Sequence, residues 1–390
     1  METLNNQGDG KDIVLKKEER KMFYCKSCLA PSARPRIVFN SEGVCNACLH
    51  AEYKRKNTDW KKRWNEVEKL CDKYRRKDGS FDVIVPGSGG KDSSYVAWKM
   101  KHELGMHPLC ITVASQMPTE IGKRNLENFI KAGFDHIMVS PDPESYRKLA
   151  KVGLIEEGQP KEPFISGITT IVVEFSIKLN IPFLMYGEQG EAEYGGSGNF
   201  DKKYFMDRAE TVTYYFSGCE SDRAVGKMGI SDHDVKWWRF PSQEVLDKSG
   251  VLMAYWSYFE DWNPYEHYLF AKKHCGFQTL PTRSIGTYTN FAQLDDDLQD
   301  LHVYLMFLKF GFGRATSDAC IDVRRGALDR KQALALVRRY DGEYPEQLIG
   351  KFVEYFRITR KEFDDVLDKF ANKDVLEKVN GIWKLKFEPY

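Results

Sequence analysis

The sequence lacks a dominant charge, a long hydrophobic run and any internal repeat. Its 58 lysines and arginines nearly balance its 57 aspartates and glutamates, which gives a net charge of +1. No global basic field therefore favours nucleic acid, and no acidic field favours a basic partner. No stretch approaches the roughly 20 consecutive apolar residues of a membrane span, and the N-terminus has no apolar core of the signal-peptide type. We expect a cytoplasmic protein without a membrane partner.

Histidine is also scarce. The eight histidines form no close cluster along the chain, so none is expected to act in catalysis. The hydrophobic content of 42% is that of a globular protein, and 390 residues suffice for two or three domains with their own cores.

Cysteine is present, and its spacing is informative. The nine cysteines are expected to be thiols or metal ligands in a reducing compartment. Cys25 and Cys28 form one C-x-x-C pair, and Cys45 and Cys48 form a second. Residues 40–43 are typical of a hairpin turn that would bring the pairs together. Four thiolates favour a structural zinc ion; two unrelated reduced pairs and a labile iron–sulfur cluster are the alternatives.

The composition changes along the chain indicate five segments. They are a flexible tail (1–21), a four-cysteine zinc module (22–52), one charged linking helix closed by Gly79 (53–79), a domain of alternating strands and helices (80–200) and a mainly helical domain (201–390). The basic side chains of the linking helix alternate with Trp60, Trp64, Val67 and Leu70 at helical spacing, which favours a packed helix over an RNA-binding one.

Strand and helix patterns alternate from Phe81 onward. Strands are predicted within 81–87, 107–114, 134–140 and 181–188, with helices between them and Thr119 as one helix cap. This order predicts an α/β fold with a doubly wound parallel sheet, whose ligands bind beyond the carboxyl ends of the strands. Residues 87–94 and 187–194 both fall at that edge.

A glycine-rich turn follows the first predicted strand. The Walker A pattern fails, because Val85 stands at its first glycine and Asp92 follows the lysine; the dinucleotide fingerprint fails because Asp92 stands at its third glycine. The motif that remains is S-G-G-K-D-S. Its glycines allow close approach of an anion, and its amides, the helix N-terminus and Lys91 supply positive charge. The predicted phosphate-binding residues are Gly87, Ser88, Gly89, Gly90, Lys91, Asp92, Ser93, Ser94 and Gly187.

This motif resembles the signature of the PP-loop ATP pyrophosphatases. More of the chain is similar to the N-acetyl sugar amidotransferase family, which makes acetamidino sugars for bacterial O-antigens and pseudaminic-acid-type sugars. The similar stretches are the cysteine pairs, M-Y-G-E-Q-G-E-A-E-Y-G-G (185–196), residues 286–326 and D-R-K-Q-A-L-A-L-V-R-R-Y-D-G-E-Y-P after them. The family usually has asparagine where this chain has Gln189.

The resemblance implies a PP-loop fold in which residues 80–200 are the ATP-binding domain, the predicted phosphate-binding residues bind ATP, and residues 201–390 are a substrate or partner domain. It also implies ATP and Mg²⁺ as cofactors and a two-step reaction. The carbonyl oxygen of a sugar N-acetyl group would be adenylated with release of pyrophosphate, and ammonia would then displace AMP to leave an amidine. The substrate would be an N-acetylated sugar or nucleotide sugar. Ammonia would come from a separate glutaminase and a cyclase-like channel subunit, since Cys219 lacks the context of a glutaminase nucleophile.

The expected residue roles follow from the S-G-G-K-D-S motif and from the family resemblance. Lys91 is expected to stabilise the leaving pyrophosphate. Asp92 would either cap its helix or help to place Mg²⁺. Glu188 would hold Mg²⁺ or ammonia, or be a polar loop residue. Predicted substrate-binding residues are Glu191, Tyr194, Gly195, Gly196 and Arg314.

Two further sets of charged residues each have two possible roles. Arg314, Arg324 and Arg325 would bind a carboxylate or phosphate, or form surface ion pairs. Residues Asp295, Asp296 and Asp297 resemble metal ligands but are more typical of negative charge at a helix N-terminus. The alternative function is a PP-loop enzyme that thiolates or ligates a tRNA base; a non-catalytic ATP-binding scaffold is a third class.

Overall fold

A computed structural model describes residues 22–196, 203–218 and 220–390. Its central sheet has the spatial order β3-β2-β1-β4-β5, and each neighbouring pair is parallel. The strands are β1 (Val83–Pro86), β2 (Pro108–Val113), β3 (Asp135–Val139), β4 (Phe183–Tyr186) and β5 (Leu252–Tyr255). The strand order reverses between β1 and β4, which creates a switch point at the carboxyl edge of the sheet. The predicted doubly wound α/β fold is confirmed.

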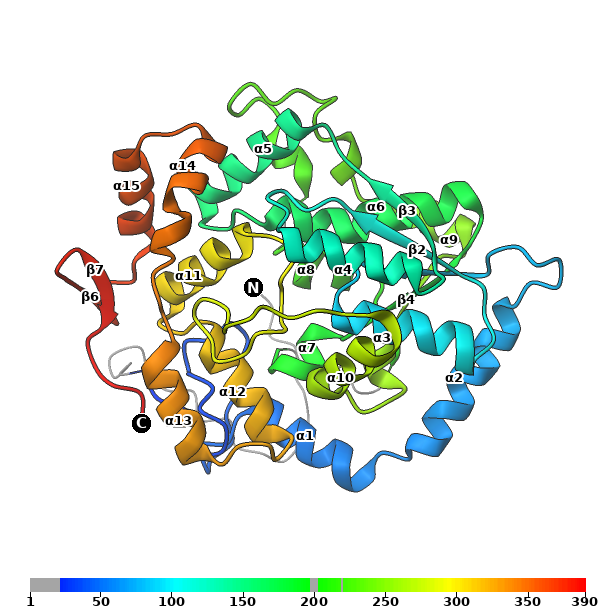
Figure 1. The fold of residues 1–390 in the computed structure, drawn as a ribbon, viewed down its shortest axis with the longest axis horizontal. Helices are drawn as coiled ribbons and strands as arrows, with labels where there is room; N and C mark the ends of the chain where they lie inside the picture. The colour runs from blue at the N-terminus through cyan, green and yellow to red at the C-terminus, as the bar shows by residue number, and fades with distance from the viewer. Residues whose placement is uncertain (1–21, 197–202, 219) are drawn as a thin grey trace.

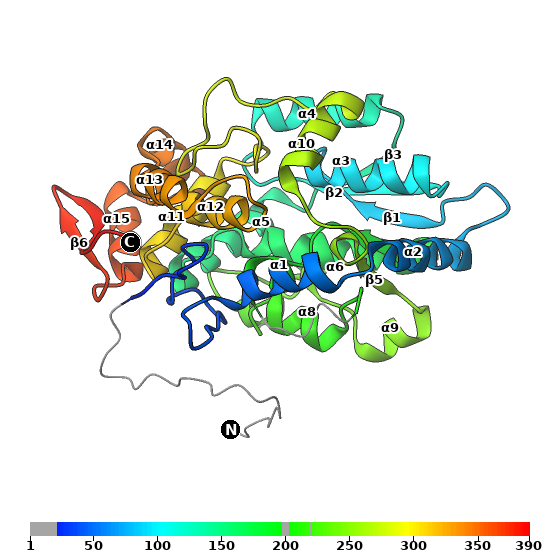
Figure 2. The ribbon, with the colours of Figure 1, turned by 90° about the horizontal axis from the view of Figure 1, so that it is seen from below.

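Helices cover both faces of this sheet, as Figure 2 shows. Val83 and Val85 of β1 join one core, and Ile84 between them joins the other, because successive strand side chains point to opposite faces. The first core includes α2 (Trp60–Tyr74), α3 (Lys91–Trp98), α4 (Glu120–Lys131) and α10 (Pro264–Cys275); the second includes α6 (Glu162–Leu179) and α9 (Gln243–Ser249).

The expected boundary at residue 200 is wrong, because the sheet continues beyond it. All four residues of β5 pair with β4, in the register Phe183 to Leu252 through Tyr186 to Tyr255. Three of them are buried. A four-residue strand buried on both faces has no alternating pattern, so it resembles the aromatic helical segments around it. The chain around it forms α8 (Arg208–Tyr214) and α9.

The linking segment is two helices, not the single helix that the sequence predicted. α1 (Asn46–Asn57) ends before Thr58, whose backbone is extended. Asp59 then starts α2 by accepting a hydrogen bond from the Lys62 amide, and aspartate is a favoured residue at such a position. Val67, Leu70 and Cys71 of α2 are buried, as the apolar spacing predicted.

Figure 1 shows the orange and red C-terminal helices on the left of the molecule. Their core also includes Met22, Tyr24, Ala150 and Leu154 from earlier in the chain. Leu301, Leu305, Phe352 and Phe363 lie in it. Its elements are α5 (Pro143–Val152), α11 (Leu298–Phe310), α14 (Ile349–Phe356), α15 (Arg360–Phe370) and the antiparallel strands β6 (Leu376–Val379) and β7 (Ile382–Leu385). The remaining helices, α12 (Arg314–Arg324) and α13 (Arg330–Tyr340), pack against the N-terminal cysteines. None of the helices in the described ranges is long and apolar enough to cross a membrane.

Candidate active site and metal centre

The glycine-rich turn joins β1 to α3 at the switch point. Gly87 N donates to Ile111 O over 3.0 Å, which holds the turn to β2. Gly90 occupies the N-cap of α3, so the amides that begin this helix lie at the turn. Gly89 has a φ of +75°, and a Cβ on it would lie 2.6 Å from Leu126 Cα in α4. Glycine is therefore required at this position by backbone conformation and by the close approach of α4.

A cavity of 440 Å³ opens beside this turn. Its lining includes residues 87–93, the end of β2, Gly187 and Glu188 after β4, and parts of α6 and α11. The structure thus brings together the residues predicted to bind ATP, apart from Ser94. Ser94 does not line the cavity; it is fully buried in α3.

Lys91, Asp92 and His267 form a connected charged group. Lys91 Nζ donates to Asp92 Oδ2, and His267 Nδ1 donates to Asp92 Oδ1 over 2.9 Å. Burial opposes ionisation of Asp92, but the charge of Lys91 and the hydrogen bond from His267 outweigh it and lower the pKa of Asp92 to about 2. Asp92 is therefore a carboxylate at neutral pH and offers the hard oxygen ligands that Mg²⁺ prefers.

His267 is held rigidly in this group. It lies on α10 and stacks on Tyr95 with a centroid separation of 4.2 Å, and the edge of Trp262 lies 4.3 Å away. The sequence analysis gave no histidine a role. The only signal available was an aromatic-rich helix start, because His267 lies 175 residues from Asp92 in the chain.

Glu188 lines the same cavity, and its pKa is shifted in the opposite direction from that of Asp92. Burial and the negative charge of Asp92 raise the pKa of Glu188 to about 7. Tyr194 Oη donates to Glu188 Oε1 over 3.3 Å. One carboxyl group is thus ionised and the other titrates near neutrality, which suits a proton acceptor.

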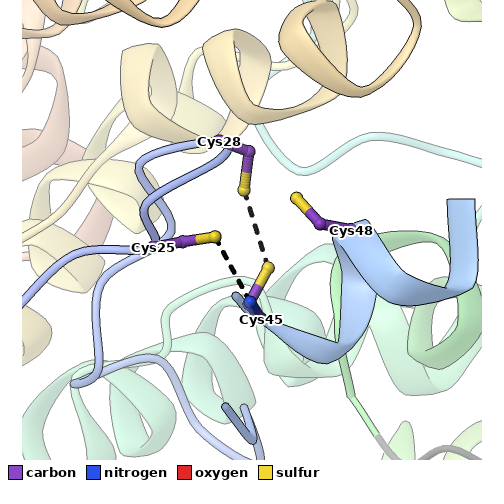
Figure 3. Close-up of side chains that lie close together, drawn as sticks. All are labelled: Cys25, Cys28, Cys45 and Cys48. Atoms are coloured by element: carbon purple, nitrogen blue, oxygen red, sulfur yellow. Dashed lines mark hydrogen bonds between the residues drawn. The ribbon is translucent and has the colours of Figure 1, made fainter. Parts of the chain in front are cut away.

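The four predicted zinc ligands converge (Figure 3). The sulfur atoms of Cys25, Cys28, Cys45 and Cys48 lie within 4.8 Å of one another, and all four residues are buried. Gly43 N donates to Asn40 O over 3.0 Å in the turn between the pairs, as the sequence predicted. This donor set fits a four-coordinate zinc ion with no open position. Bound zinc would hold the module together and leave no site for chemistry.

Helix α12 supports this cluster from the C-terminal half. Cys320 Sγ donates to Cys28 O over 2.8 Å, and Arg324 Nη1 lies 3.6 Å from Cys28 Sγ. Arg324 therefore lies against the cysteine cluster, where its charge would offset that of metal-bound thiolates. Arg325 pairs with Asp322 at 2.7 Å.

Several residues predicted to bind substrate lie outside the cavity lining. Glu191 accepts from Arg36 Nε over 2.9 Å. Gly196 O accepts from Asn46 Nδ2 over 2.7 Å, and Gly195 lies against Ala47. These contacts connect α7 (Gly190–Tyr194) and the residues after it to the zinc module. Arg314 pairs with Asp318 at 2.9 Å. Their roles toward substrate stay predictions.

Other polar residues near the site have local structural contacts. Gln189 Oε1 caps α7 by accepting from the Ala192 amide over 2.8 Å. Asp296 Oδ1 accepts from the Leu298 amide at the start of α11 over 2.9 Å, and Asp297 pairs with Lys351 at 2.6 Å. Asp295 lines the cavity. The tail 1–21 and Cys219 lie outside the described residues.

The C-terminal region matches a known protein-family model. Residues 285–387 match the model of the C-terminal domain of WbpG-like LPS biosynthesis proteins. This match confirms the family resemblance drawn from the sequence. The matched region contributes α11 to the cavity wall and α12 to the cysteine cluster.

Other similarities are more distant. An uncharacterized protein of Methanocaldococcus jannaschii is 28% identical over 109 residues, which cover 27% of this chain and 38% of that protein. The chain thus aligns with well under two thirds of this relative. A predicted subunit of a tRNA methyltransferase from the same organism has a TM-score of 0.28 at 19% identity, covering 50% of this chain and 76% of that one. NMN synthetase from Francisella tularensis has a TM-score of 0.27 at 12% identity, covering 58% and 90%. The fold assignment rests on the strand order of this chain.

Proposed function

We propose that this chain is an ATP-dependent amidotransferase that converts the N-acetyl group of a bacterial surface-polysaccharide sugar into an acetamidino group. The observation that carries the proposal is the S-G-G-K-D-S turn at the switch point, which shares one cavity with Glu188. The WbpG-like match of residues 285–387 supports a substrate from LPS biosynthesis.

The first step is adenylation. The carbonyl oxygen of the N-acetyl group attacks the α-phosphorus of ATP, the bond to the bridging oxygen breaks, and pyrophosphate leaves. The loop amides and Lys91 face the charge that grows on this leaving group, which is where fixed positive charge lowers a barrier most. Asp92, with its low pKa, would hold Mg²⁺, which when bound neutralises phosphate charge. His267 fixes the orientation of the Asp92 carboxylate.

The second step replaces oxygen by nitrogen. Ammonia adds to the imidate carbon, the carbon–oxygen bond breaks, and AMP leaves with the former carbonyl oxygen. Nitrogen must lose a proton as this happens. Glu188 suits the role of acceptor, because its pKa of about 7 leaves a large ionised fraction at neutral pH while keeping useful basicity. We further propose that a separate glutaminase and a cyclase-like channel subunit deliver the ammonia.

The contacts of α1 and α2 favour packing over the tRNA-modifying alternative. Lys54 is buried and donates to both Glu193 oxygens at 2.8 Å. Arg63 Nη1 donates to Tyr258 O at 2.9 Å, and Arg75 Nη2 donates to Leu104 O at 2.8 Å. These cations hold the two helices to the protein.

The proposal is tested by product analysis. The protein would be incubated with ATP, Mg²⁺, ammonium and a panel of mono- and diacetamido sugars, free and nucleotide-linked. Mass spectrometry is expected to find a sugar in which one oxygen has become NH, together with AMP and pyrophosphate. Formation of ADP and phosphate, or AMP without a change in any sugar, would contradict it. Salt-sensitive binding of tRNA would favour the alternative.

A further inference from the structure

A second polar group borders the same cavity, on the wall that α6 and α11 form. Lys161 precedes α6, and Gln299 and His302 lie in the first turns of α11; all three line the cavity. Asp296, just before α11, lies behind Lys161. The cavity-lining positions of α6 follow a helical spacing of 161, 164, 165, 168, 169 and 172, so one face of this helix forms the wall.

The polar atoms of this group have few partners within the described part of the chain. Lys161 has a side chain only 6% exposed, and its one polar contact is Asp296 Oδ2 at 3.5 Å. Asp296 Oδ2 and His302 Nδ1 are buried with no hydrogen-bond partner among the described residues. Buried polar atoms are normally hydrogen-bonded, and each one left without a partner costs roughly 1–3 kcal/mol. Lys161 and His302 line the cavity, whereas Asp296 does not, so a polar ligand in the cavity would complete the first two residues.

The unmet groups define the chemistry of that ligand. Lys161 has three donors and Asp296 Oδ2 is an acceptor. Burial and the charge of Lys161 lower the pKa of His302 to about 3, so its ring is neutral. A hydroxyl group both donates and accepts, so a ring with several hydroxyls can pair with both Lys161 and His302. Phe164, whose ring lies 4.5 Å from Lys161 Nζ, and Phe291 supply apolar surface for the carbon face of such a ring.

The origin of this wall favours an acceptor sugar over the ribose of ATP. The sheet and its own loops form the anion cradle, whereas His302 and Asp296 belong to the region that matches the WbpG-like C-terminal domain. We propose that Lys161 and His302 form the subsite that binds the hydroxyls of a sugar acceptor beside ATP, with Asp296 positioning Lys161. This inference rests on the proposed function and assigns residues to its acceptor.

Calorimetric binding tests the subsite without turnover. Full-length protein would be saturated with α,β-methylene-ATP and titrated with N-acetylglucosamine and with UDP-N-acetylglucosamine. His302→Leu and Lys161→Gln are each expected to weaken sugar binding about 10- to 100-fold, the loss of one strong hydrogen bond, and to leave affinity for the ATP analogue within about threefold. Lys178→Gln is the control, because Lys178 lies on the same helix outside the cavity and pairs with Glu174.

Each contrary result overturns the assignment in its own way. Equal loss of ATP-analogue and sugar affinity would mean that the group binds the ribose of ATP. Wild-type protein that binds neither sugar would exclude this class of ligand. If Lys161→Gln melts early, His302→Leu decides, because it leaves the Lys161–Asp296 pair intact; unchanged sugar affinity in a less stable His302→Leu would show a structural role. Because no product is measured, sugar binding without amidine formation would contradict the proposed reaction and keep the subsite.

Discussion

At the scale of single residues, two carboxyl groups that line one cavity have pKa values shifted in opposite directions. Asp92 has two cationic or hydrogen-bonding neighbours, Lys91 and His267, and its pKa falls to about 2. Burial and the charge of Asp92 act on Glu188 more strongly than Lys91 and the hydrogen bond from Tyr194, so its pKa rises to about 7. Environments that separate the pKa values of two acids in this way assign them different roles: a permanent anion and a group that exchanges a proton.

Lys91→Ala tests the catalytic role of the cradle. Because Lys91 faces charge that increases during pyrophosphate departure, its loss is expected to lower kcat by about 10²- to 10³-fold, with a smaller effect on ATP-analogue affinity. Steady-state pyrophosphate release measures the rate. Lys123→Ala is a suitable control, since Lys123 is exposed on α4 and pairs with Glu120 at 2.7 Å. An undiminished rate in a folded Lys91→Ala protein would remove the loop from the mechanism.

Glu188→Gln tests the raised pKa through stability. The folded protein holds the Glu188 proton up to about pH 7, whereas the unfolded chain releases it near the ordinary value of 4.5. Wild-type stability at this group is therefore fully present below the unfolded pKa and is lost as the pH rises through 7. Glu188→Gln cannot ionise, so it is expected to melt higher than wild type at pH 8 and similarly at pH 5. Melting curves at both values measure this; equal differences at the two values would contradict the shift.

At the scale of elements, the β1–α3 turn was predictable and its packing was not. The local sequence Ser88, Gly89 and Gly90 is enough to predict a turn that binds an anion. A Cβ on Gly89 would lie 2.6 Å from Leu126 Cα in α4. This close approach depends on the packing of α4 against the turn, which no local sequence pattern predicts. The same division explains β5, a four-residue strand whose identity comes from its parallel pairing with β4.

Gly89→Ala separates these two roles of glycine. A Cβ at this φ of +75° meets the backbone of Leu126, so the free energy of unfolding is expected to fall by about 2–4 kcal/mol. Gly90→Ala is the matched control, because its Cβ would meet only Ser88 Oγ at 3.5 Å. Denaturant unfolding of both variants gives the comparison. Two equally stable proteins would mean that α4 yields readily at this contact.

At the scale of the whole molecule, residues distant in sequence complete each site, and this is where sequence reasoning ended. The cysteine spacing predicted the metal cluster because its ligands come in two local pairs. The sequence left Arg324 either to bind a carboxylate or phosphate or to form a surface ion pair, and the structure places it beside Cys28, 296 residues away in the chain. Likewise His267 and Lys161 reach the cavity only through the packing of α10 and α6. Their residue types carry no signal that distinguishes them from other surface or core positions.

The four-cysteine module also contacts α7, the helix that follows Glu188. Arg36 and Lys54 pair with Glu191 and Glu193 of α7, and Asn46 binds Gly196 O. Helix α7 follows Glu188 by one residue. Movement of the module therefore displaces the loop that carries Glu188.

Removal of the metal is expected to loosen that loop. Wild-type protein should contain about one zinc ion per chain, and Cys48→Ser should lose it, because a hydroxyl is a poor zinc ligand. Without metal the module cannot hold its pairs rigidly, so amide hydrogen exchange should accelerate across 190–196 while β1 and β2 stay protected. Cys71→Ala, a buried cysteine of α2 outside the cluster, should keep zinc and normal exchange in α7. If Cys48→Ser lacks zinc and yet the amides of α7 exchange as in the wild type, the module does not stabilise the loop that carries Glu188. The contacts of Arg36, Lys54 and Asn46 would then not restrain α7.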